Sequence, residues 1–153
     1  AERTPENRRF HRELFLQGIS NLLENTGSAV QFVEKASHIL NQEKTDGIAV
    51  FKALDQGGNE ELKTLFQAYC YDIAILIFNL QSLLRLEKVT IGGGISSQPL
   101  LIDEINHQYH DLFSQRGHEQ FEALPIQAAR FHNESNLIGA ASYFYSSTYQ
   151  KKF

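Results

Sequence analysis

Val89-Thr90-Ile91-Gly92-Gly93-Gly94-Ile95-Ser96 is the stretch that decides the fold, because a short β-branched segment runs directly into three glycines. Residues 88–91 predict a buried strand. Glycine lacks a Cβ, so the chain can turn sharply after this strand and come close to a planar or anionic ligand. Backbone amides at the start of the following helix can hydrogen-bond that ligand. The spacing fits neither a P-loop nor Gly-x-Gly-x-x-Gly, so a turn with only a structural role remains an alternative.

Helical patterns precede this strand. Apolar residues recur at helical spacing over residues 13–40, and Thr26-Gly27-Ser28 divides the pattern, with Ser28 as the N-cap of a second helix. A short helix is expected over residues 48–54, ending at Gly57-Gly58. Asn59 is a suitable N-cap for a long helix that reaches about residue 86. That helix is apolar on nearly every face over residues 73–80, which predicts that other elements, including a sheet, enclose it.

Further elements are predicted after the glycine run. A helix is expected over residues 99–113, a second short strand over residues 124–129 and a last helix over residues 134–149. A strand–helix–strand unit with a crossover helix implies parallel strands and a right-handed connection. The fold class is therefore α/β, with a short parallel sheet in a helix-rich chain.

The composition limits the function classes. The 153 residues are 42% hydrophobic and 21% charged, which fits a single globular domain over residues 1–153. A net charge of −4 leaves no electrostatic footprint for nucleic acid in this segment. The most apolar run, residues 73–78, falls short of the roughly 20 residues that cross a bilayer. The single cysteine, Cys70, excludes an internal disulfide and favours the cytoplasm. The lack of methionine predicts that the sequence is part of a longer polypeptide.

Four segments stand in an order and spacing that carry a family resemblance: residues 22–32 (LLENTGSAVQF), 46–84 (from DGIAVFKALDQGGNEELK), 88–105 (KVTIGGGISSQPLLIDEI) and 125–144 (PIQAARFHNESNLIGAASYF). The third resembles the adenosine motif of the sugar kinase/heat-shock/actin superfamily. Together they resemble the ROK (repressor, open reading frame, kinase) family. The resemblance implies the helix-rich half of an actin-like ATPase fold, which is ribonuclease H-like.

The resemblance also implies a site. Gly92, Gly93, Gly94 and Ser96 would line the pocket for the adenosine of ATP, bound with Mg²⁺, and the turn at residues 57–59 would form the other wall. The chain would be the C-terminal, nucleotide-facing lobe of a two-lobed protein, and the N-terminal lobe would be absent. The family's catalytic aspartate and phosphate motifs belong to that absent lobe, so we predict no catalytic residue here.

One segment departs from the family pattern. The family's zinc segment is a Glu-x-Gly-His element followed by three cysteines and a glutamate, but here Arg8 stands at the first glutamate and the cysteines are missing. His11 resembles the family histidine and Glu24 the closing glutamate. Both are candidate sugar ligands; the alternatives are a solvated histidine and a surface carboxylate. We predict no bound zinc.

Three functions follow as hypotheses. The chain is the ATP-binding lobe of a kinase for a hexose or amino sugar, inactive without the missing lobe. Alternatively, it belongs to a non-catalytic sugar-sensing transcriptional regulator or degenerate ROK protein, which the lost zinc ligands favour. The third is a helical interaction module in which the glycines only form a turn. Expected partners are the sugar, the missing lobe and a second copy of the chain, and neither nucleic acid nor a membrane is expected to bind this segment.

Overall fold

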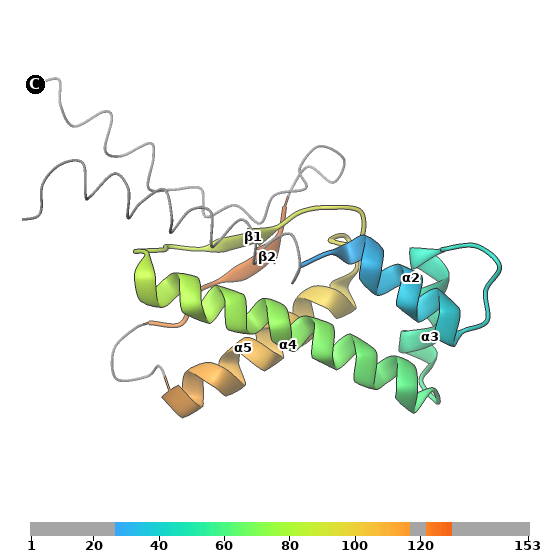
Figure 1. Cartoon of the computed structure of the whole chain (residues 1–153). Helices are drawn as coiled ribbons and strands as arrows, with labels where there is room; N and C mark the ends of the chain where they lie inside the picture. The colour runs from blue at the N-terminus through green and yellow to red at the C-terminus, as the bar shows by residue number, and fades with distance from the viewer. Residues whose placement is uncertain (1–26, 117–121, 130–153) are drawn as a thin grey trace, which may run out of the picture.

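The computed structural model describes residues 27–116 and 122–129 of the chain. Its elements, in chain order, are α2 (Ala29–Ile39), α3 (Gly47–Gln56), α4 (Glu60–Leu83), β1 (Val89–Ile91), α5 (Pro99–Arg116) and β2 (Ile126–Ala128) (Figure 1). The predicted last helix over residues 134–149 lies outside the described residues, as do His11 and Glu24.

Side-chain caps fix where the first three of these helices begin. Ser28 Oγ accepts a hydrogen bond from Gln31 N at 3.3 Å, Asp46 Oδ1 accepts one from Ile48 N at 2.9 Å, and Asn59 Oδ1 accepts one from Leu62 N at 2.9 Å. Each bond satisfies a backbone N–H that has no partner within its helix. The predictions of Ser28 and Asn59 as N-caps are therefore confirmed. The predicted end of α3 is also confirmed, because Gly57 follows it with a φ of 70°.

Replacing Asn59 with alanine is expected to lower the free energy of unfolding by about 0.5–2 kcal/mol, because Leu62 N–H loses its acceptor. Urea denaturation monitored by circular dichroism measures this change. Asn59→Asp keeps a side-chain acceptor at the same place and is expected to retain the stability of the wild type. An Asn59→Ala variant as stable as the wild type would show that the cap contributes nothing.

The two strands pair in parallel, as predicted, with α5 as the crossover between them. Val89 lies opposite Ile126, Thr90 opposite Gln127 and Ile91 opposite Ala128. Two hydrogen bonds extend the pairing, from Val89 N to Pro125 O at 2.9 Å and from Ala129 N to Ile91 O at 2.8 Å. Each strand is only three residues long, so the sheet depends on the helices around it.

The core lies between the helices and the sheet. Ile73 and Ile77 of α4 pack with Ile105 and Tyr109 of α5, and Val89, Ile91 and Ile126 belong to the same buried cluster. The helix that packs most extensively on α4 is α5, followed by α2. The apolar stretch of α4 is thus enclosed chiefly by α5, and residues of both strands join the same buried cluster. In Figure 1, α2 and α3 gather at the N-terminal end of α4.

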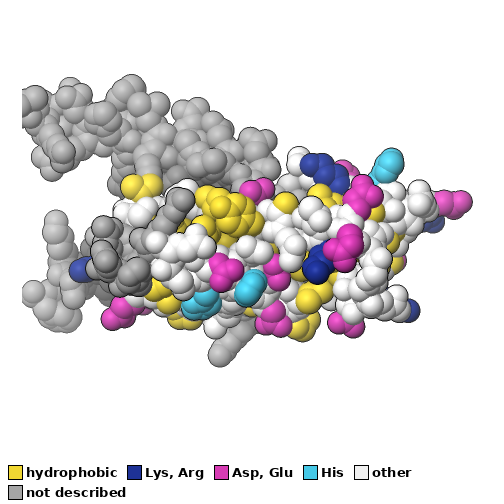
Figure 2. All heavy atoms as spheres, turned by 90° about the horizontal axis from the view of Figure 1, so that it is seen from below, with side chains coloured by type: hydrophobic (Ala, Val, Ile, Leu, Met, Phe, Trp, Pro, Cys, Tyr) yellow, Lys and Arg dark blue, Asp and Glu magenta, His cyan; other side chains and the backbone are white. Residues whose placement is uncertain are grey.

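Helix α4 ends at Leu83, before the predicted end near residue 86. Leu84 has extended backbone angles, with φ −123° and ψ 143°, because the chain must leave the helix there to enter β1. Among the described residues, no helix is long and apolar enough to cross a membrane. On the described part of the face shown in Figure 2, Lys and Arg side chains are scattered among acidic, histidine and hydrophobic ones.

Candidate functional site

The glycine run forms a closed turn at the carboxyl end of β1. Gly93 has a φ of 106°, in a region of backbone conformation that L side chains rarely adopt. Two hydrogen bonds close the turn, because Ser96 N donates to Gly93 O at 3.1 Å and Ser96 Oγ donates to the same oxygen at 2.8 Å. Of the three glycines, Gly93 thus has the conformation that glycine adopts more readily than other residues.

The backbone of the turn is open on its outer side. A Cβ placed on Gly93 or Gly94 would meet no atom within 4 Å, so the space beside both residues is free for a ligand. Helix α5 starts shortly after the turn, at Pro99, and a helix N-terminus carries partial positive charge. The turn can therefore hold a planar or anionic group by its backbone, but it supplies no acid, base or nucleophile.

Ser96 differs from the glycines in its exposure. It is 1% exposed, and its hydroxyl is used by the bond to Gly93 O. The side chain therefore stabilises the turn from the inside. If the turn binds a nucleotide, Ser96 contributes by keeping residues 92–96 in this shape.

Helices α2 and α3 support the turn through Ile95. A Cβ on Gly47, the first residue of α3, would lie 3.5 Å from Ile95 Cγ2 and 3.7 Å from Val33 Cγ2. These are ordinary van der Waals distances, so the start of α3 lies beside both Ile95 and Val33 of α2. Gly47 is far from the glycine run in the sequence, so its position beside Ile95 could not be predicted from the local pattern.

The predicted second wall, at residues 57–59, lines a hollow of about 310 Å³. Gly57 and Gly58 have φ angles of 70° and 91°. The hollow is also lined by Lys63 and Gln67 of α4 and by Leu100 and Glu104 of α5. The hollow therefore touches the helix that follows the glycine run, although residues 92–96 do not line it.

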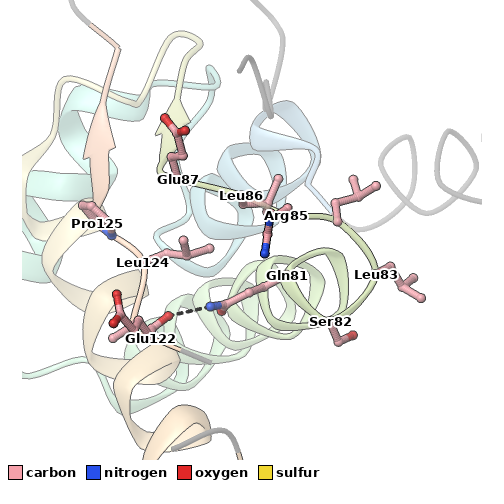
Figure 3. A pocket seen from close by; sticks show the side chains of 11 residues that line it. Gln81, Ser82, Leu83, Arg85, Leu86, Glu87, Glu122, Leu124 and Pro125 are labelled. Carbon is pink, nitrogen blue, oxygen red and sulfur yellow. Dashed lines mark hydrogen bonds between the residues drawn. The ribbon is translucent and has the colours of Figure 1, made fainter. Parts of the chain in front are cut away.

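A larger hollow, of about 890 Å³, lies between the end of α4 and the segment that leads into β2, lined by residues 81–87 and 122–125 (Figure 3). This hollow meets the start of β1, whereas the glycine turn follows its carboxyl end. Ligands of open parallel sheets bind outside the carboxyl ends of the strands. The glycine turn is therefore the better candidate site.

Buried polar groups fix the wall of the larger hollow. Tyr109 Oη donates to Gln81 Oε1 at 2.5 Å and accepts from Leu124 N at 3.0 Å. Gln81 Nε2 donates to Glu122 O at 2.6 Å, the bond drawn in Figure 3. Burial raises the pKa of Tyr109 above its ordinary value, and its hydrogen bonds offset part of the rise. This network, which we call the Tyr109 clamp, holds together α4, α5 and the segment that leads into β2.

Replacing Tyr109 with phenylalanine is expected to lower the free energy of unfolding by about 1–3 kcal/mol, because Gln81 Oε1 and Leu124 N would lose a partner inside the protein. Guanidinium denaturation measures the change. The matched control is Tyr71→Phe on α4, where the side chain is 42% exposed and an effect within about 0.5 kcal/mol is expected. Equal effects of the two substitutions would argue against the clamp.

Cys70, His107 and Asp111 carry side chains that can ligate metals or react, and they lie apart from the glycine turn. Cys70 is fully buried in the core. Burial, with the nearby Glu104 carboxylate, raises the pKa of its thiol. His107 and Asp111 pair at 3.6 Å on the exposed side of α5. Within residues 27–116 and 122–129, no three His, Cys, Asp or Glu side chains gather as a metal site would require.

Comparisons with known proteins place the chain. A sequence model of the ROK family matches residues 18–146. Among solved structures, the chain is similar to a ROK family protein from Streptococcus pneumoniae TIGR4, crystallised in complex with sucrose, with a TM-score of 0.62 and 24% identity. The match covers 77% of this chain and 40% of that protein. A search of curated proteins found no match.

The structural likeness agrees with the expected fold class, because the described helices and the short parallel sheet correspond to a helix-rich part of an actin-like ATPase fold. The family match over residues 18–146 includes all four segments in which the resemblance was seen. The chain therefore belongs to the ROK family.

Proposed function

We propose that the chain is the ATP-binding lobe of a ROK-type sugar kinase. The observation that carries this proposal is the open glycine turn, where Gly93 and Gly94 leave space for a ligand directly after β1. In this proposal Gly92, Gly93 and Gly94 lie against the nucleoside, while Ser96 holds the turn that presents them. The absence of side chains on this surface fits a flat purine ring, which needs close approach of the backbone.

Phosphoryl transfer needs more than a nucleotide-binding wall. A catalytic base must orient the sugar hydroxyl, and Mg²⁺ bound with ATP neutralises the charge that develops on the phosphates. The glycine turn supplies neither a base nor a carboxylate for the metal. We therefore assign both tasks to a second lobe, and the match to only 40% of the S. pneumoniae protein supports a longer parent protein.

The proposed substrate is a hexose or an amino sugar. The similar S. pneumoniae structure was obtained with sucrose, which supports a sugar ligand for this chain as well. His11 and Glu24 remain candidate sugar ligands, and both lie outside the described residues. We further propose that the protein is cytoplasmic and that it forms a homodimer. Sedimentation velocity would measure its oligomeric state.

An assay of ADP release tests the kinase. The 153-residue chain alone is expected to release no ADP with any hexose or amino sugar, whereas the two-lobed protein is expected to release ADP only when its sugar is present. Sugar-dependent release of ADP by the chain alone would contradict the assignment of the catalytic groups to another lobe.

A second candidate is a non-catalytic sugar-sensing regulator or degenerate ROK protein. The observation that favours it is the loss of the zinc-segment cysteines, together with Arg8 in place of the sugar-binding glutamate. In that case the two-lobed protein would bind its sugar and release no ADP. A helix-turn-helix segment in the parent sequence would support this candidate, whereas a catalytic aspartate with a phosphate loop would support the kinase.

The purified protein is expected to contain no stoichiometric zinc, because the chain has one cysteine and that residue, Cys70, is buried in the core. Mass spectrometry of the metal content measures this after dialysis against a zinc-containing buffer and then a metal-free one. One zinc ion retained per chain would overturn our interpretation of residues 8–24.

A further inference from the structure

We draw no further inference here: the strongest candidate, the partly exposed apolar stripe formed by Tyr71, Ile75 and Phe78 along one side of α4, carries nothing because nothing in the structure shows what covers it.

Discussion

Replacing Gly93 with valine is expected to weaken nucleotide binding by at least about tenfold, a loss of about 1.4 kcal/mol. Gly93 has a φ of 106°, and a β-branched residue held in that region costs about 1–3 kcal/mol, so the turn would change its shape. The added side chain would also project into the open space that we assign to the nucleotide. Calorimetric titration with ADP measures the affinity of the variant.

A matched variant separates loss of the site from general strain. Asn41, in the loop between α2 and α3, also has a positive φ, of 53°. Asn41→Val is expected to strain the backbone in a similar way while leaving nucleotide affinity unchanged. If Gly93→Val binds ADP as the wild type does, the glycine turn does not contact the nucleotide. If Asn41→Val loses binding equally, reduced stability explains the effect and the assignment fails.

Replacing Phe32 with alanine is expected to lower the free energy of unfolding by about 3–5 kcal/mol. Phe32 is 3% exposed and stacks on Tyr69 with ring centroids 4.6 Å apart, while Phe66 and Phe51 lie at 5.9 Å and 6.2 Å. The truncation would leave a cavity where α2, α3 and α4 meet. Since a domain is stable by only about 5–15 kcal/mol, this loss approaches the whole stability of the fold.

Guanidinium denaturation measures the effect, with Val30→Ala as the control on the same helix. Val30 is 66% exposed, so its truncation is expected to change the free energy of unfolding by no more than about 0.5 kcal/mol. A Phe32→Ala variant that loses less than about 1 kcal/mol would contradict the central position of this aromatic cluster. It would also weaken the argument that α2 and α3 support the glycine turn through Ile95.

Features that depend on neighbouring residues could be predicted from the sequence. Ser28 and Asn59 cap helices because each places a side-chain oxygen next to the N–H group three residues later. The strand before the glycines and the parallel pairing followed from β-branched residues and a crossover helix. The end of α4 was less predictable, because residues 84–86 suit a helix and leave it only to reach β1.

Features that depend on distant residues could not be predicted. The Tyr109 clamp joins Gln81 and Leu124, which are far from Tyr109 in the sequence. The only sign of it in the sequence is Gln81, a polar residue in an apolar helix that needs a hydrogen-bond partner if it is buried. At the site, three consecutive glycines predicted a turn but not that Gly93 is the one with a positive φ. The sequence also placed Ser96 in the pocket without indicating that its hydroxyl bonds inward.

Calorimetric titration of ATP or ADP into the wild-type two-lobed protein tests the central claim most directly. We predict saturable binding at one site per chain, with a dissociation constant of about a millimolar or tighter, the range in which enzymes bind their substrates. If the folded protein shows no binding heat at nucleotide concentrations of roughly a few millimolar, the glycine run is only a turn. The chain would then be a ROK family member without a nucleotide site, and the proposed kinase would be wrong.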